Sequence, residues 1–138
     1  MPFVQTNWWS AEFPEEWQAE ENDGIVTLTD PDNIGALDIT ALIKEAGQVA
    51  EAELDELARE NFPSDVDSTA VTVGELSGQY VEYEEDDDAW REWILVLDGV
   101  LLYATYNCDV DDRGIDDAVV DQILTTIVIE DSEYFEAD

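Results

Sequence analysis

Carboxylates are the only reactive side chains that this sequence holds in large number. Its 138 residues include 37 Asp and Glu, one Cys and no His. Without an imidazole, the chain cannot form a Ser-His-Asp triad or a Cys-His pair, and it lacks the usual nitrogen ligands for metals. Cys108 ends an apolar run with no Lys or Arg beside it in the sequence. That setting favours a buried core residue over a nucleophile.

A carboxylate pair is the catalytic arrangement that this composition would supply. A paired-carboxylate hydrolase needs two acids at a defined separation, in environments that push their pKa values apart. With 37 acids in the chain, some pair meets any distance requirement by chance, so the sequence singles out none. We therefore rank a carboxylate-dependent hydrolase third among the functional hypotheses. We expect a protein that is not an enzyme and binds no cofactor.

Asp109 opens a segment that begins like a calcium-binding loop. Asp109 and Asp111 stand at its first and third positions, and Gly114 stands at the sixth. The pattern fails at the fifth position, where Arg113 replaces an oxygen ligand, and at the twelfth, where Val120 replaces the bidentate Glu. We therefore expect no dedicated metal site.

A structural role accounts for the same acids better. Asp111, Asp112 and then Asp116 and Asp117 precede an apolar helical repeat. There, negative charge complements the helix dipole and caps free N–H groups. Loose condensation of cations from salt is the remaining interpretation. Its weak candidates are Asp109, Asp111 and Asp112.

Five consecutive acids occupy a predicted hairpin tip. They are Glu84, Glu85, Asp86, Asp87 and Asp88. Such a run is usually a solvated turn. The functional alternative is a docking surface for a basic protein partner.

The adjacent pair Trp8 and Trp9 is a second interaction candidate. Most of the five tryptophans should lie in the core, because the strands must be covered. Neighbouring residues of a strand point to opposite faces, so Trp8 and Trp9 cannot both face the same way. One of the two therefore lies either at an exposed patch or under a helix, and if it is exposed it is an interaction anchor.

The charge balance is the strongest compositional signal. Four Lys and Arg stand against 37 acids, which gives a formal net charge of −33. Molar salt shortens the Debye length to about 3 Å and screens the repulsion within such a surface. The acids are spread over helices, turns and tail, which favours adaptation to a salt-rich cytoplasm with counter-cations from salt. The alternative is an acidic surface that binds a basic partner.

Several partner classes and locations are disfavoured by what the sequence lacks. Phosphate contacts need clusters of Lys and Arg, so we expect no nucleic-acid partner. Residues 1–10 lack a basic segment with a long apolar run, and no stretch approaches the roughly 20 apolar residues of a membrane span. A single cysteine allows no internal disulfide. We therefore expect a cytoplasmic protein with no membrane contact.

Apolar periodicity indicates the elements that must position these side chains. Strands are predicted over 7–13, 25–29, 36–43, 70–73, 79–84, 90–97 and 100–108, and helices over about 46–62 and 115–128. Gly74 and Gly78 separate two of the strands, and Asp98-Gly99 is a strong hairpin signal. We predict one α+β domain over residues 1–138: a mostly antiparallel sheet of about six or seven strands flanked by two main helices. Residues 130–138 are predicted to be a frayed acidic tail.

The order of these elements resembles the PsbP-like superfamily over nearly the whole chain. The segments that carry the resemblance are Phe13-Pro14-Glu15-Glu16-Trp17, the strand pair through 35–39, the helix near 49–62, the strands from Val73-Gly74 to Tyr83, the 90–108 hairpin and the closing helix with Ile123-Leu124-x-x-Ile127. The superfamily includes the photosystem II subunit PsbP, the lipoprotein DcrB, a Ran-binding nuclear-import factor and effector-loading chaperones of type VI secretion.

The resemblance implies a fold and a broad role, and no catalytic residues. The implied fold is an α/β/α sandwich, an antiparallel sheet between helices, and the implied role is binding or assembly. Our leading hypothesis is therefore a non-enzymatic binding or accessory domain in the cytoplasm of a halophile. The second hypothesis is an acidic immunity-type antagonist that neutralises a basic toxin or nuclease. Unlike PsbP and DcrB, this sequence shows no export segment.

Overall fold

A computed structural model describes residues 2–6, 9–43, 56, 58–63, 65–97 and 100–129, and most of these residues form two antiparallel sheets. The larger sheet has seven strands in the order β3-β4-β5-β9-β8-β7-β6. They are β3 (Gln18–Asn22), β4 (Ile25–Thr29), β5 (Gly35–Ile43), β6 (Thr69–Val73), β7 (Leu76–Glu85), β8 (Asp88–Leu97) and β9 (Val100–Asp109). The predicted α+β class with a mostly antiparallel sheet is confirmed.

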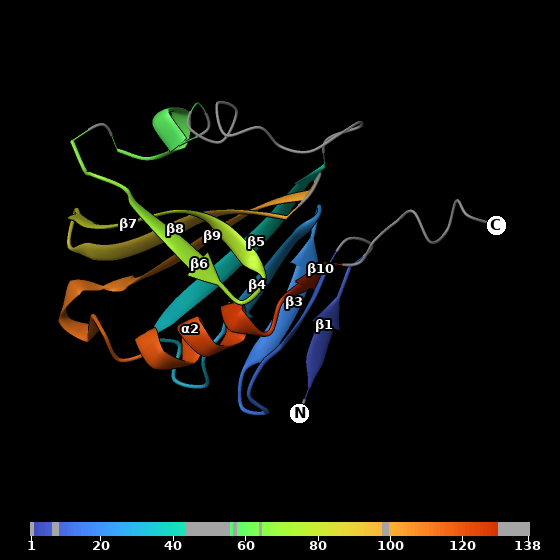
Figure 1. Cartoon of the computed structure of the whole chain (residues 1–138). Coiled ribbons are helices and arrows are strands. Elements are labelled where there is room, and N and C mark those ends of the chain that lie inside the picture. Colours follow the sequence, from blue (N-terminus) through green and yellow to red (C-terminus); the bar gives the residue numbers. More distant parts are fainter. Residues whose placement is uncertain are drawn as a thin grey trace.

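A smaller sheet and an α-helix pack together against one face of the larger sheet (Figure 1). The smaller sheet runs β1-β2-β10, made of β1 (Phe3–Gln5), β2 (Trp9–Glu12) and β10 (Val128–Ile129). The helix α2 (Asp117–Thr125) follows a short 3-10 turn, η1 (Val110–Asp112). No helix in the part of the chain that the structure describes is long and apolar enough to cross a membrane.

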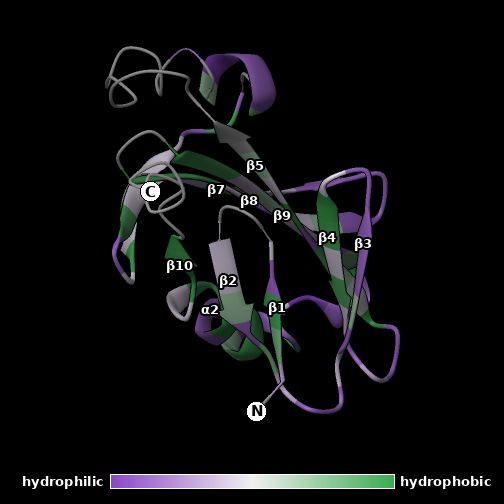
Figure 2. Ribbon diagram, turned by 90° about the vertical axis from the view of Figure 1, so that its right-hand side faces the viewer, coloured by the Kyte–Doolittle hydropathy of each residue, from purple (hydrophilic) through white to green (hydrophobic). Residues whose placement is uncertain are grey.

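The β8–β9 hairpin is buried on both faces at its centre. Successive strand residues point to opposite faces, so neighbouring side chains enter different clusters. Leu95 and Leu102 pack with Ile123 of α2, whereas Ile94 and Leu101 pack with Phe62 on the other face. Figure 2 shows β1, β2, β10 and α2 grouped on the same side of the larger sheet. The apolar residues of these two strands form uninterrupted runs, Ile94–Leu97 and Val100–Tyr103, a pattern typical of strands that are covered on both faces.

The tip of the β7–β8 hairpin is a two-residue turn made only of aspartates. Asp86 and Asp87 have φ angles of 51° and 71°, in the left-handed region that Asp tolerates better than most residues. The predicted acidic hairpin tip is therefore confirmed. The strands of the next hairpin, β8 and β9, also pair as predicted. Its turn, Asp98 and Gly99, lies outside the described residues.

Three strands lie outside the predicted set, and each gives little signal in the sequence. Every residue of β3 is exposed, so the strand shows no apolar alternation. The strands β1 and β10 have three and two residues. The predicted helix over 115–128 is too long, because α2 ends where the hydroxyls of Thr125 and Thr126 bond the carbonyls of Gln122 and Ile123, at 2.7 and 2.6 Å. The chain then enters β10.

Gly78 was expected to separate two strands, but it lies inside β7. It pairs with Leu95, and a Cβ at this position would lie 1.8 Å from the carbonyl oxygen of Ile94. A glycine therefore allows two strands to approach closely here. The turn between β6 and β7 is made by Gly74, whose φ of +61° suits glycine.

Much of the predicted helix over 46–62 lies outside the described residues. Its last turn is helical, with the Phe62 N–H donating to the Ala58 carbonyl at 2.9 Å. The predicted strand over 7–13 corresponds to β2, and the predicted tail over 130–138 is also outside the described residues.

Candidate functional site

The structure brings two acidic segments together that are 20 or more residues apart in the sequence. Asp88 pairs with Asp109 across β8 and β9, and the Val110 N–H donates to the Asp87 carbonyl at 2.9 Å. The hairpin tip therefore lies against η1. We call the resulting surface the acidic end; its members are Glu84, Glu85, Asp86, Asp87, Asp88, Asp109, Asp111 and Asp112.

Local structure explains several acids that follow the tip. Asp109 caps η1 by accepting the Asp111 backbone N–H at 2.9 Å. Asp117 lies in the first turn of α2, where its charge complements the helix dipole. Asp116 forms no side-chain cap bond, contrary to the expectation for this residue. Among the described residues, no three His, Cys, Asp or Glu side chains are grouped to hold a metal ion.

An aromatic pair adjoins the acidic end on one face of the sheet. Tyr83 and Trp90 are cross-strand partners, with ring centroids 6.3 Å apart and ring planes 6° from parallel. Both are half-buried. The next pair on the same face, towards the tip, is Glu85 and Asp88. Partly exposed aromatic rings therefore stand beside two carboxylates.

A buried carboxylate binds one member of this aromatic pair, Tyr83. Glu92 is 4% exposed and accepts hydrogen bonds from the hydroxyls of Tyr83 and Tyr103. Burial, and then the hydrogen bond to Glu92, raises the pKa of both tyrosines well above its ordinary value. The two phenols therefore remain donors, and the Tyr83 ring keeps one orientation. A fixed aromatic face beside carboxylates is suited to a guanidinium or ammonium group.

Of the predicted tryptophan pair, the structure places Trp9 alone. Trp9 is 1% exposed and belongs to the core beside α2, so it is not a surface anchor, and Trp8 lies outside the described residues. Trp17 and Trp93 are core residues as well. The tryptophan that adjoins an acidic surface is Trp90, which sequence reasoning did not single out. Its position opposite Tyr83 in the acidic hairpin is the signal that would have identified it.

Arg91 connects α2 to the sheet on the opposite face. Its guanidinium lies 5.3 Å from the Tyr80 ring centroid and 4.7 Å from that of Trp93. It also donates to Asp121 at 2.7 Å and to Asp117 at 3.5 Å. Burial would lower the pKa of Arg91, but its hydrogen bonds to Tyr80 and Asp121 outweigh that effect and raise it. The group is therefore a permanent cation that holds the helix in place.

Asp30 organises the loop between β4 and β5. Its buried carboxylate accepts the backbone N–H groups of Asp32, Ile34 and Gly35 at 3.1, 3.0 and 2.9 Å. Burial alone would raise the pKa of Asp30, but these N–H groups stabilise the anion and the net effect lowers it. The charged form of Asp30 therefore stabilises the loop.

Asp116 forms a second buried carboxylate close to the first. It accepts the Tyr106 hydroxyl at 2.6 Å. Burial raises the pKa of Asp116, the Tyr106 bond opposes that rise, and the charge of Asp30 adds to it. The pKa values of Asp30 and Asp116 are thus shifted in opposite directions, as a paired-carboxylate hydrolase would need. The two residues are only 5% and 7% exposed, however, so a substrate has little access to them. Burial also raises the pKa of the nearby Cys108 thiol, which disfavours the thiolate.

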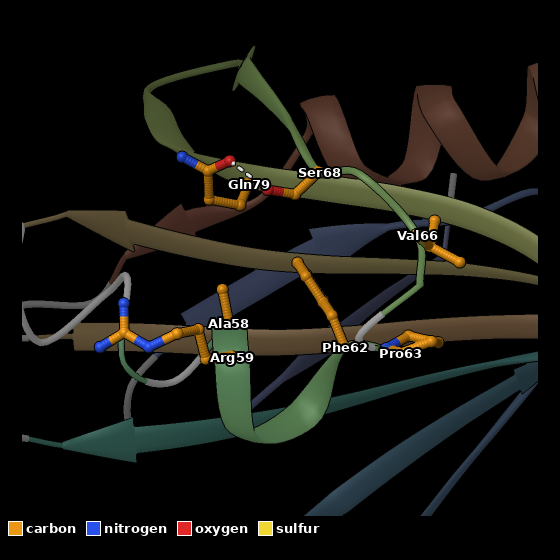
Figure 3. Close-up of a pocket in the computed structure, with 7 residues that line it drawn as sticks. All are labelled: Ala58, Arg59, Phe62, Pro63, Val66, Ser68 and Gln79. Atoms are coloured by element: carbon orange, nitrogen blue, oxygen red, sulfur yellow. Dashed lines mark hydrogen bonds between the residues drawn. The ribbon is translucent and has the colours of Figure 1, made fainter.

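A groove of about 540 Å³ opens on the face of the sheet that carries Phe62 (Figure 3). One side is lined by Ala58, Arg59, Phe62, Pro63 and Val66, which are apolar except for the Arg59 guanidinium. Ser68 and Gln79 line the other, joined by a 3.0 Å hydrogen bond. The groove lies where the chain enters β6.

Comparisons with known proteins identify the fold and no closer relationship. No protein-family model matches the sequence, and no curated protein matches it. A protein of known structure from Bacteroides thetaiotaomicron matches with a TM-score of 0.71 and 17% identity, over 91% of this chain. This chain spans only 46% of that protein's length.

Two further matches extend over most of both chains. Cyanobacterial PsbP (CyanoP) from Synechocystis sp. PCC 6803 matches with a TM-score of 0.61 and 9% identity, over 94% of this chain and 92% of its own. LpqN, involved in cell envelope biogenesis of Mycobacterium tuberculosis, matches with a TM-score of 0.53 and 13% identity, over 89% and 83%. At these identities the likeness concerns the fold alone. The element order in the sequence and these two structures agree: the chain has the PsbP-like fold.

Proposed function

We propose that this chain is a non-enzymatic binding or accessory domain of a salt-rich cytoplasm that engages a basic protein segment at its acidic end. The observation that carries the proposal is the stacked Tyr83–Trp90 pair, in which Glu92 accepts the Tyr83 hydroxyl and which Glu85 and Asp88 flank. We also propose the α/β/α sandwich as its full architecture, because Phe62 packs on the face opposite α2.

The aromatic pair matters because salt weakens charge attraction. At molar salt the Debye length is about 3 Å, so carboxylates alone attract a basic partner poorly. A cation in contact with an aromatic face gains about 0.5–1 kcal/mol at an exposed site and about 2 kcal/mol when desolvated. Trp90 beside Asp88 therefore supplies a short-range attraction that persists where long-range steering is screened.

An acidic antagonist of a basic toxin or nuclease is the second candidate. The convergence of Glu84–Asp88 with Asp109–Asp112 favours it, since it concentrates negative charge at one end of the molecule. An antagonist would inhibit a basic enzyme encoded beside it, whereas an accessory domain would bind without inhibition. Inhibition assays with the products of neighbouring genes separate the two. The hydrolase hypothesis remains third, because the Asp30–Asp116 pair is enclosed.

A peptide titration tests the binding proposal. The probe is an octapeptide of alternating Arg and Ser, added to ¹⁵N-labelled protein in 1 M KCl. We expect the Trp90 indole N–H and the amides of residues 84–88 to shift. Trp90→Leu should weaken binding about fivefold, the equivalent of roughly 1 kcal/mol for an exposed cation–π contact.

A matched pair of charge variants provides the control. Glu85→Gln with Asp88→Asn removes two charges beside the aromatic pair, and Glu20→Gln with Glu21→Gln removes two from the exposed strand β3. Only the first should weaken binding strongly. Equal weakening by both, with no effect of Trp90→Leu, would mean that the peptide senses net charge and that no site exists at the acidic end.

A further inference from the structure

The two edges of the seven-stranded sheet differ sharply in charge. The β3 edge carries Glu20 and Glu21, and charge on an edge strand prevents pairing with other chains. The β6 edge, Thr69–Val73, carries no charge, in a chain in which 30% of the residues are charged. Four of its five residues are β-branched, the type that favours strands.

The β6 edge is open to a partner. Among the described strands its neighbour is β7 alone, so alternate backbone N–H and C=O groups point away from the sheet. Within the part of the chain described, no hydrogen bond to these outward groups is formed. The side chains of Thr69, Ala70 and Thr72 are exposed.

Charges beside the edge indicate what kind of chain fits it. Asp67 precedes β6 and Glu75 follows it, and both are exposed. Glu75 lies in the two-residue turn after β6, so it flanks the strand and takes no part in its pairing. A second copy pairing antiparallel with β6 would bring the flanking acids of both copies close together, between two bodies of net charge −33. Like charges at short range repel one another. Charge complementarity therefore favours a different protein, with a basic residue near each end of the added strand.

We propose that the β6 edge binds an extended segment of another protein by strand addition. The segment has an uncharged centre and a Lys or Arg at each end, near the flanking acids Asp67 and Glu75. Main-chain hydrogen bonds supply affinity, and pockets for alternate side chains supply specificity. The groove beside Ser68 lies on the face of β6 that carries Ala70, because Ala70 pairs with the groove residue Gln79 (Figure 3). It accepts an apolar side chain of the added strand. This surface is separate from the acidic end and does not depend on it.

A nonapeptide provides the test: Lys at both ends with seven alternating Thr and Val between them. It is titrated into ¹⁵N-labelled protein at the lowest KCl concentration at which circular dichroism shows a folded chain. We expect the amides of Thr69–Val73 to shift and those of Gln18–Asn22 to stay unchanged. Replacing both Lys by Glu should weaken binding at least tenfold. Alternate amides of the bound peptide point towards β6 and away from it. N-methylation of the set that faces β6 should abolish binding, and N-methylation of the other set should leave it unchanged, which tests strand pairing without changing the protein.

A charge reversal on the protein makes the result specific. Asp67→Lys with Glu75→Lys should reverse the preference, so that the peptide with Glu ends binds better. The matched control, Glu20→Lys with Glu21→Lys on β3, should leave the preference unchanged. Shifts confined to the acidic end, equal shifts at β3, or no shift at Thr69–Val73 would overturn the proposal. A dimer in sedimentation with protected β6 amides would also overturn it, since a second copy would then be the occupant.

Discussion

Asp30 and Asp116 are neighbouring buried carboxylates with opposite electrostatic roles. The anion of Asp30 is stabilised by three backbone N–H groups, and its pKa is lowered. The pKa of Asp116 is raised by burial and by the charge of Asp30, so its ionisation opposes folding. At the residue scale, the same side-chain type therefore stabilises the fold at one position and strains it at another.

Two asparagine substitutions should separate these roles. Asp30→Asn should lower the free energy of unfolding at pH 7 by about 1–3 kcal/mol, because backbone donors lose their anionic acceptor. Asp116→Asn keeps an acceptor for Tyr106 and removes a charge, so it should leave the protein as stable or more stable at pH 7. Chemical denaturation of both variants measures the difference.

The pH dependence of the stability of the two variants tests the direction of each pKa shift. A lowered pKa gives stability above the ordinary Asp pKa of about 3.9 that is lost as the pH falls through the folded value. The cost of Asp30→Asn should therefore shrink in acid. A raised pKa gives a penalty that grows as the pH rises through the same region, so any gain from Asp116→Asn should vanish below about pH 4. A loss of stability in Asp116→Asn at pH 7 would contradict this assignment.

At the scale of elements, α2 is held to the sheet by both packing and Arg91. Val120, Ile123 and Leu124 are buried, and the guanidinium lies over two aromatic rings while it pairs with two helix acids. Arg91 is one of only four basic residues in the sequence, and its guanidinium is used to bind α2 to the sheet. The helix should therefore depend on it strongly.

Removing the guanidinium should loosen α2 specifically. Arg91→Met should lower the free energy of unfolding by about 2 kcal/mol, because a cation–π contact and partly buried ion pairs are lost. Arg91→Lys should recover only part, since an ammonium lacks the planar group. Arg113→Met is the control, because its pairs are exposed and worth about 0–1 kcal/mol. Hydrogen exchange should show faster α2 amides in Arg91→Met alone; unchanged protection would refute the role of Arg91.

Substitutions in the turn of the acidic hairpin should make the protein more stable. Asp86 and Asp87 both adopt positive φ, which asparagine and glycine accept at lower cost. Asp86→Asn with Asp87→Gly should raise the free energy of unfolding by about 1 kcal/mol, from lower strain and less repulsion. Thermal melts in moderate salt measure it. A drop in stability would mean that the two aspartates form contacts beyond the turn.

The elements that sequence periodicity predicted are those with apolar alternation or strong turns. The strand β4 was predicted with its observed bounds, and the acidic tip with its position. The strand β3 carries no apolar pattern, and Gly78 looks like a break although it serves a close approach to Ile94. Each acidic segment was visible, but their convergence was not. The Glu92 network and the Arg91 contact depend on strand register and helix placement, which local patterns do not contain.

At the scale of the whole molecule, acidic residues are spread over the surface and are also gathered at the acidic end. Acids occupy the β3 edge, the hairpin tip, η1 and the exposed side of α2, as expected for a surface kept apart by its charge. The acidic end is the place where they adjoin fixed aromatic rings. The two proposed roles of the acidity, solvent adaptation and partner binding, are therefore compatible: we propose that the general charge serves the first and the Tyr83–Trp90 surface the second.

The melting temperature as a function of KCl concentration tests the central claim of salt adaptation most directly. Self-repulsion at a net charge of −33 should make the melting temperature rise steeply from 0.1 M to 1 M, while the Debye length falls from about 10 to about 3 Å. The rise should then flatten towards 2 M. A near-neutral domain of similar size, measured alongside, should show only the shallow, steady rise of general salt effects. A curve no steeper than that control would contradict salt adaptation and leave partner binding as the reason for the acidity.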